Sequence, residues 1–227
     1  GLSRHRAGRR LGPGARHRSR AGDGVNPRPH TRPATRERIL TASLEQMRRN
    51  GYAGTGVKAI LVAAEAPFGS LYHHFPGGKE EVGAETIRRG GVAYRELVEA
   101  FYVDGAALGD ATQAFFDEAA AFVESTAFVD ACPIATIAGE IASTSDTMRR
   151  AAHEAFESWL RVIERQLVAA GVDARRGREI AVELFCAIEG AFLLARTSHN
   201  AEPIRTVGRA VARSVREALA GARVPVG

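Results

Sequence analysis

The chain has 227 residues, of which 45% are hydrophobic and 25% are charged, and its formal net charge is +5. This length can bury a core without disulfides or metals, and the hydrophobic share excludes a fully disordered chain. No run approaches the roughly eighteen consecutive apolar residues of a membrane-spanning helix, so we expect no membrane partner.

Targeting signals and cysteine usage both favour the cytoplasm. The first residues lack the apolar stretch that a secretory signal needs after its basic start. Cys132 and Cys186 form no C-x-x-C pair, and their spacing fits neither a metal knuckle nor a disulfide framework. The sequence therefore predicts a cytoplasmic protein in which both cysteines are small core residues.

The N-terminal segment 1–33 is rich in Arg, Gly and Pro and has almost no large apolar side chains. Residues 1–32 carry a charge of +8 and residues 33–90 carry +2, which leaves −5 for the rest of the chain. The segment cannot offset the entropy of ordering, so we expect a disordered arm. It is either a basic arm that adds nonspecific phosphate contacts or the product of an upstream reading frame ahead of a native start near Val25. We favour the second interpretation.

A helical pattern begins at Thr35, which is available as an N-cap, and ends at the C-terminal signal Asn50-Gly51. A second helix is predicted over 57–64 with Thr55 as its cap, and a short third helix over 67–74 with its proline in the first turn. The sequence Pro-Gly-Gly at 76–78 then breaks the chain.

The remainder of the chain is predicted to be helical. A long helix runs from Lys79 towards Ala100, and strand patterns are nearly absent. Five more helices are expected, at about 110–128, 133–142, 146–170, 174–197 and 203–220. The predicted fold class is all-α, with a three-helix head at 34–80 and a larger helical body at 81–227.

The second and third helices are joined by a short turn around Glu65-Ala66, which favours the sharp crossing of a helix-turn-helix. In the third helix, PFGSLYHHF, Leu71 and Phe75 are spaced to anchor the head's core. The other positions are predicted to face outward: Pro67, Phe68, Gly69, Ser70, Tyr72 and His73. This polarity predicts a DNA-reading helix.

Three features suit contact with nucleic acid. Gly69 allows close approach of the backbone to a partner. Tyr72 and His73 offer hydrogen-bond donors to phosphate oxygens. Lys79 combines an ammonium group with the N-terminus of a helix, which is a phosphate site.

The segment 51–82, GYAGTGVKAILVAAEAPFGSLYHHFPGGKEEV, resembles the DNA-binding signature of the TetR family. The sequences SLYHHFPGGKEE, ACPIATIAGE at 131–140 and AIEGAFLLAR at 187–196 are similar to its LmrA/YxaF-like branch. The resemblance spans residues 34–220 and implies a ligand-responsive repressor that binds operator DNA.

Carried onto this sequence, the resemblance implies phosphate contacts from Tyr52, Thr55, Tyr72, His73 and Lys79. It implies contacts to base edges around 67–69. Relatives often carry Lys or Arg where this chain has phenylalanine at 68, so a bidentate contact to guanine is not available there. The phenyl ring either touches a thymine methyl group or packs within the head.

Aromatic side chains recur through the body, where core packing is the ordinary role. The resemblance implies that some line a cavity for a small hydrophobic effector, and we expect Phe122, Cys132 and Trp159 among them. It also implies a homodimer formed as a four-helix bundle from 174–197 and 203–220, although the apolar stripes of these helices are equally suited to the body's own core. A two-fold dimer matches a pseudo-palindromic operator.

Other classes of function have weaker support. His73 and His74 are adjacent on a helix and point about 100° apart, so we expect no metal site. The sequence Pro-Gly-Gly-Lys at 76–79 lacks the spacing of a nucleotide-binding loop, and no nucleophile elbow or cofactor motif occurs. We therefore expect neither an enzyme nor a cofactor. The remaining alternatives are an all-α protein that binds small molecules and a helical interaction module without a DNA target.

Overall fold

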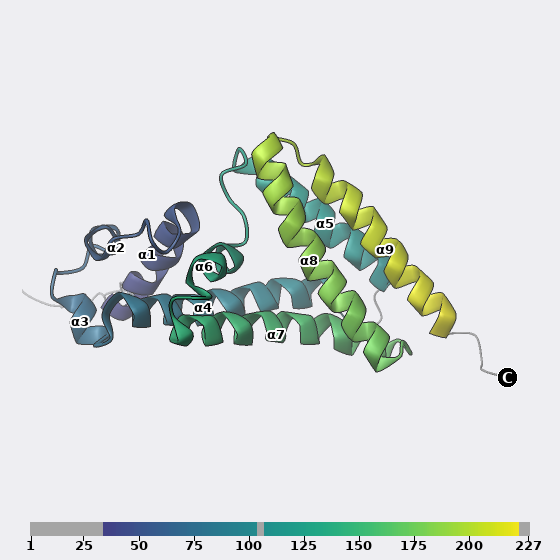
Figure 1. Cartoon of the computed structure of the whole chain (residues 1–227), viewed down its shortest axis with the longest axis horizontal. Coiled ribbons are helices and arrows are strands. Elements are labelled where there is room, and N and C mark those ends of the chain that lie inside the picture. Colours follow the sequence, from purple (N-terminus) through teal and green to yellow (C-terminus); the bar gives the residue numbers. More distant parts are fainter. Residues whose placement is uncertain (1–33, 104–106, 223–227) are drawn as a thin grey trace, which may run out of the picture. The chain divides into compact units, whose positions relative to one another are not determined.

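A computed structural model describes residues 34–103 and 107–222, and the predicted arm at 1–33 lies outside these ranges. The described residues form nine helices and no strand, so the all-α prediction is confirmed (Figure 1). The helices are α1 Thr35–Asn50, α2 Val57–Ala63, α3 Ser70–His74, α4 Gly78–Phe101, α5 Leu108–Ser125, α6 Pro133–Ile141, α7 Asp146–Ala169, α8 Ala174–Ser198 and α9 Glu202–Ala222.

Two predicted helix caps are wrong. Thr35 is the first residue of α1, and Ala34 occupies the N-cap position without a side-chain hydrogen bond. Gly56 precedes α2 as its N-cap, while the Thr55 hydroxyl donates to the carbonyl of Gly51 at 2.7 Å. Threonine hydroxyls commonly bond to a carbonyl four residues earlier, and that local bond competes with capping.

The turn between α2 and α3 is longer than predicted. Helix α2 ends in a Schellman motif, in which the Ala66 amide donates to the Leu61 carbonyl and the Glu65 amide to the Val62 carbonyl. Glu65 takes the left-handed conformation, with φ of 48°. Residues 67–69 form a further turn, closed by the Ser70 amide on the Pro67 carbonyl at 3.0 Å. The third helix therefore begins at Ser70 rather than at Pro67.

Helix α4 is unbroken from the head into the body and packs along α7 (Figure 1). The two helices approach closely at Gly91, where an added Cβ atom would lie 2.7 Å from the Cβ of Ala155. The indole Nε1 of Trp159 donates to the Gly91 carbonyl at 2.7 Å, and Trp159 is fully buried. This contact satisfies a buried donor and fixes the position of α4 on α7.

Helix α9 packs on α5 and α8. Its buried side chains include Ile204, Val211 and Val215, which belong to the predicted apolar stripe. The buried side chains of the α8 stripe also face the core of this chain: Ile180, Leu184, Ile188, Ala191 and Ala195. The stripes thus stabilise the body itself, and a dimer contact must use other faces of α8 and α9.

Among the described residues, no helix combines the length and the apolar character that crossing a membrane requires.

The contact between α9 and α5 depends on Gly208. An added Cβ atom at this position would lie 2.5 Å from the Cβ of Phe116, which is fully buried. Gly208→Ala should therefore lower the free energy of unfolding by about 1–3 kcal/mol, as overpacked cores do. Gly139→Ala is the control, because its Cβ atom meets nothing within 4 Å on an exposed face of α6. It should stabilise the protein by up to about 1 kcal/mol. Urea denaturation checks both, and equal stabilities would contradict this account.

Candidate DNA-binding surface and effector cavity

Helix α3 separates apolar anchors from an exposed surface. Leu71 and Phe75 are fully buried in the head, whereas Phe68 is 72% exposed and Tyr72 59% exposed. The other residues expected to face outward, Pro67, Gly69 and His73, are exposed, and Ser70 is half-buried. Large exposed aromatic side chains rarely occur side by side without a binding role. The structure therefore gathers most of the predicted DNA-reading residues on one exposed surface.

The start of α4 lies beside this surface. The ammonium of Lys79 is 4.2 Å from the centroid of the Tyr52 ring, a cation–π contact, and desolvation lowers the pKa of this lysine. Burial raises the pKa of Tyr52, so its phenol stays neutral and able to donate. The Glu81 carboxylate accepts from the Gly77 amide at 2.7 Å. One of the amide donors expected for phosphate is therefore already occupied.

Thr55 is buried, unlike the other predicted DNA contacts. Its side chain is buried, with 1% exposure, and its hydroxyl is used in the bond to Gly51. This placement argues against the predicted phosphate contact and assigns the threonine to the shape of the loop between α1 and α2.

Several polar contacts join the head to the body, and two of them connect α1 and the loop after it with α6 and the loop before it. The Glu140 carboxylate at the end of α6 accepts from the backbone amides of Tyr52 at 3.2 Å and Ala53 at 2.8 Å. The guanidinium of Arg48 in α1 pairs with Asp130 in the loop before α6. The only sequence sign of the first contact is Gly51, because the bare, positive-φ backbone there leaves room for the Glu140 carboxylate.

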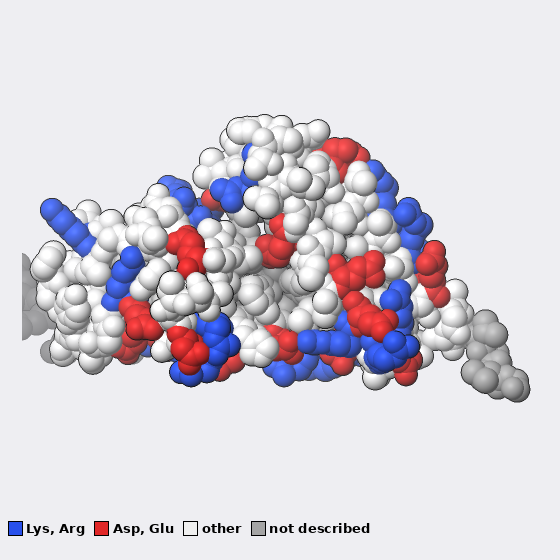
Figure 2. All heavy atoms as spheres, viewed as in Figure 1, with Lys and Arg blue, Asp and Glu red and all other residues white. Residues whose placement is uncertain are grey.

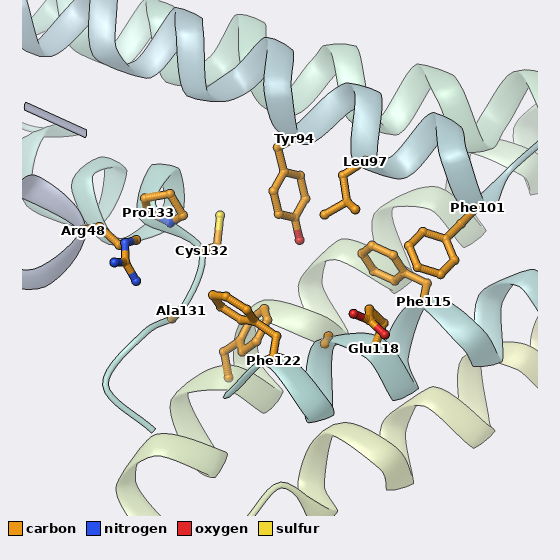
Figure 3. Close-up of a pocket in the computed structure, with 12 residues that line it drawn as sticks. Arg48, Tyr94, Leu97, Phe101, Phe115, Glu118, Phe122, Ala131, Cys132 and Pro133 are labelled. Atoms are coloured by element: carbon orange, nitrogen blue, oxygen red, sulfur yellow. The ribbon is translucent and has the colours of Figure 1, made fainter. Parts of the chain in front are cut away.

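A partly open cavity of about 300 Å³, large enough for a small organic molecule, lies mainly in the body (Figure 3). Its wall combines parts of α1, α4, α5, α8 and the segment that leads into α6. The lining residues are Arg48, Tyr94, Leu97, Phe101, Phe115, Glu118, Ala119, Phe122, Ala131, Cys132, Pro133 and Phe192.

The predicted effector residues are placed differently from one another. Phe122 and Cys132 line the cavity, whereas Trp159 does not. The indole lies against the ring of Tyr94, with centroids 4.5 Å apart, and its N–H is bonded to the α4 backbone. Tyr94 is therefore the aromatic wall of the cavity, and Trp159 supports it from behind. Periodicity cannot separate these two roles, because both side chains belong to one apolar cluster.

A polar cluster stands at the Cys132 side of the cavity. Burial raises the pKa of the Glu189 carboxyl to about 7, and a hydrogen bond with the Cys132 thiol partly opposes that rise. Burial also raises the pKa of the Cys132 thiol, with a further increase from the charge of Glu189. The pKa of Tyr94 is raised by burial and then by the charges of Cys132 and Glu189. The three groups thus share an environment with little water and a negative electrostatic potential.

Among residues 34–103 and 107–222, no group of three or more His, Cys, Asp or Glu side chains is placed to hold a metal ion. The imidazoles of His73 and His74 are 4.9 Å apart, centroid to centroid, and meet edge to face.

A helix-turn-helix head with an exposed reading helix, joined to a helical body with an apolar cavity, defines a DNA-binding regulator. Residues 39–86 match the family described as "Bacterial regulatory proteins, tetR family", and residues 109–210 match "Transcriptional regulator LmrA/YxaF-like, C-terminal domain". The chain belongs to the TetR family of transcriptional regulators.

Two regulators of known sequence and one solved structure illustrate this similarity. It is 32% identical to the HTH-type transcriptional regulator LmrA of Bacillus subtilis, over 75% of this chain and 90% of that protein. It is 25% identical to the HTH-type transcriptional repressor NemR of Escherichia coli, over 77% of this chain and 90% of NemR. A TetR transcriptional regulator from Legionella pneumophila has the same fold, with a TM-score of 0.70 and 21% identity over 81% of this chain and 98% of that one.

The buried Glu189 carboxyl predicts an unusual pH dependence of stability. Because its pKa is about 7 in the folded protein against an ordinary value of 4.5, the folded state holds the proton more tightly. Stability should therefore fall as the pH rises through this interval. Between pH about 5.5 and about 7.5 the loss should be on the order of 2 kcal/mol. Denaturation of wild type and Glu189→Gln at both pH values measures it, and equal slopes would contradict the assignment.

Proposed function

We propose that this protein is a dimeric transcriptional repressor that binds a pseudo-palindromic operator and is released from it by a small hydrophobic effector. The observation that carries the proposal is the exposed aromatic surface of α3 and the turn before it, next to which α4 begins before it runs on to line an apolar cavity. The relative NemR is a transcriptional repressor, which supports the same direction of control.

On DNA, α3 would enter the major groove with Pro67, Phe68 and Gly69 towards base edges. The exposed ring of Phe68 has no hydrogen-bonding group, so its best base partner is a thymine methyl group. Phosphate contacts fall to Tyr72, His73 and Lys79, with Ser70 and Tyr52 at the margin of the surface. These contacts hold the head in place, whereas the base contacts set the sequence preference.

Effector binding would act on the head through three physical links. The first is α4, which lines the cavity with Tyr94 and carries Lys79 in its first turn. The second is α6, whose start borders the cavity and whose Glu140 holds the loop after α1. The third is Arg48, a residue of α1 that itself lines the cavity. An effector with different affinity for two head positions would shift their populations, by a coupling of typically about 1–3 kcal/mol.

The homodimer would use the side of α8 that its own chain leaves uncovered. An exposed stripe of small and apolar residues runs along this helix: Val182, Cys186, Gly190, Leu193 and Leu194. Cys132 is buried as predicted, whereas the prediction of a core position for Cys186 is wrong. Figure 2 shows a surface largely free of charge where α8 approaches its turn into α9. Small residues at the centre of the stripe allow a second helix to approach closely. Two heads related by a two-fold axis would then face successive half-sites.

The direct test is a gel shift with DNA from upstream of the protein's own gene, repeated with a panel of lipophilic compounds. We expect a retarded protein–DNA complex whose affinity falls with salt concentration. At least one compound should dissociate it. A helical interaction module or a DNA-independent binding protein would shift no fragment. A complex that every compound leaves intact would contradict release by an effector.

Lys79→Ala should weaken binding to operator and random DNA alike. Because one phosphate contact is lost, the slope of log K against log salt should fall by about one unit. Fluorescence anisotropy at several salt concentrations measures this slope. Arg165→Ala is the matched control, since that cation is exposed on α7 in the body and should leave the slope unchanged. Loss of specific binding alone would remove Lys79 from the phosphate contacts.

Leu193→Glu should dissociate the dimer. Leu193 is 64% exposed in the single chain, and a dimer through the α8 stripe would bury a carboxylate at this position at high cost. Sedimentation velocity should show a monomer for this variant and a dimer for the wild type. Val92→Glu on an exposed part of α4 is the control and should remain dimeric. A dimeric Leu193→Glu protein would place the interface elsewhere.

A further inference from the structure

We propose that the effector is a lipophilic organic cation, with an apolar body in the aromatic cavity and an ammonium-type group at the wall between Asp130 and Glu189. This inference rests on the proposed function only in taking the cavity as the effector site. It is carried by the charges and the unsatisfied acceptors around that wall.

Carboxylates outnumber free cations around the cavity. Arg48 is the only cationic residue of its lining among the described residues, and its nitrogens are already engaged. Its Nε and Nη2 atoms donate to Glu45 at 2.8–3.2 Å, and its Nη1 atom pairs with Asp130. Glu118 adds a further carboxylate to the lining. The guanidinium is thus neutralised, and the remaining field favours a positive ligand.

Two buried carboxyl groups next to the lining each have an oxygen without a donor. Within the described part of the chain, Oδ1 of Asp130 and Oε1 of Glu189 are buried and accept no hydrogen bond. Asp130 is only 6% exposed and is paired with the lining residue Arg48, and Glu189 is bonded to the lining residue Cys132. A buried acceptor without a donor is costly. A ligand that brings N–H donors and a positive charge would remove this cost.

The cavity wall also suits a cation. Tyr94 and Phe122 present rings to the interior, and the hydroxyl of Tyr94 points away from α4 into the same space (Figure 3). Aromatic faces attract cations, and this attraction grows when water is excluded. Burial is the main cause of the raised pKa values of Tyr94 and Cys132, and the charge of Glu189 raises both further.

The two other charge classes fit less well. An anion at Arg48 would have to displace Asp130 and leave that carboxylate buried without its partner, which is strongly unfavourable. A neutral ligand without donors would fill the aromatic space but leave both carboxyl oxygens unsatisfied. A cation is the one of the three ligand classes that both fills the aromatic space and supplies donors to the two carboxyl oxygens.

Three probes of equal shape separate these classes: 2-(1-naphthyl)ethylamine as its ammonium, 2-(1-naphthyl)ethanol and 1-naphthylacetate. Titration calorimetry of the full chain at pH about 8 should show the ammonium binding at least about tenfold more tightly than the alcohol, the value of one good charge-assisted contact. The carboxylate should bind most weakly. An alcohol that binds as tightly as the ammonium, a carboxylate that binds most tightly, or no measurable binding of the ammonium would overturn the proposal.

Variants locate the charged group. Glu189→Gln and Asp130→Asn should each reduce the ammonium-to-alcohol ratio to within about threefold. Glu183→Gln is the matched control on the same helix, because its carboxylate accepts from Ser214 of α9 and borders no part of the cavity. It should keep the wild-type ratio. A ratio unchanged in both Glu189→Gln and Asp130→Asn would overturn the assigned wall, and circular dichroism confirms that each variant is folded.

The gel shift keeps this inference separate from the proposed function. Tight binding of the ammonium without release of operator DNA would contradict ligand-controlled release and leave the charge preference standing. Release of the operator by all three probes to the same extent would support ligand-controlled release and contradict the preference for a cation.

Discussion

The unbroken helix α4 is the constraint on which the rest of the structure depends. Its first turn lies beside the reading surface, its middle is fixed to α7 by the Trp159 bond at Gly91, and its later turns form a wall of the cavity. A continuous helix transmits displacement because its backbone bonds resist bending. Head and body therefore cannot be described as independent units, although their sequences match two separate family descriptions.

Most of the fold could be predicted because the helices combine apolar periodicity with clear breaks. Each predicted body helix begins and ends within three residues of the observed one, since Gly, Pro and capping residues mark these ends. The error at α3 has a local cause. The proline at 67 suits the first turn of a helix, but the chain at 67–69 closes a separate turn on Ser70 instead. Sequence alone does not rank two such closures of similar energy.

The candidate site could be predicted only in part. The outward position of Tyr72 follows from the helical pattern of α3, and Phe68 is exposed as well, although it lies in the turn before this helix. The cavity depends on contacts between distant segments, so Arg48 and Tyr94 carried no sign of their role. Trp159 was expected in the lining because a large aromatic residue near a cavity and one behind its wall have the same local sequence. The family relationship is shown, whereas the DNA and effector contacts remain predictions.

The contact between Gly51 and Glu140 limits how this protein can be recombined with its relatives. The loop after α1 has room for the Glu140 carboxylate only because residue 51 has no side chain and takes a positive φ. A chimaera that joins a foreign reading head to this body must therefore bring a matching glycine and two free amides, or lose one of the links between them. Exchange at the middle of α4 alone would preserve the helix yet leave α6 without its partner. The contact between head and body thus depends on the shape of the loop at 51–53. A working hybrid needs residues 51–53 and 140 to be exchanged together.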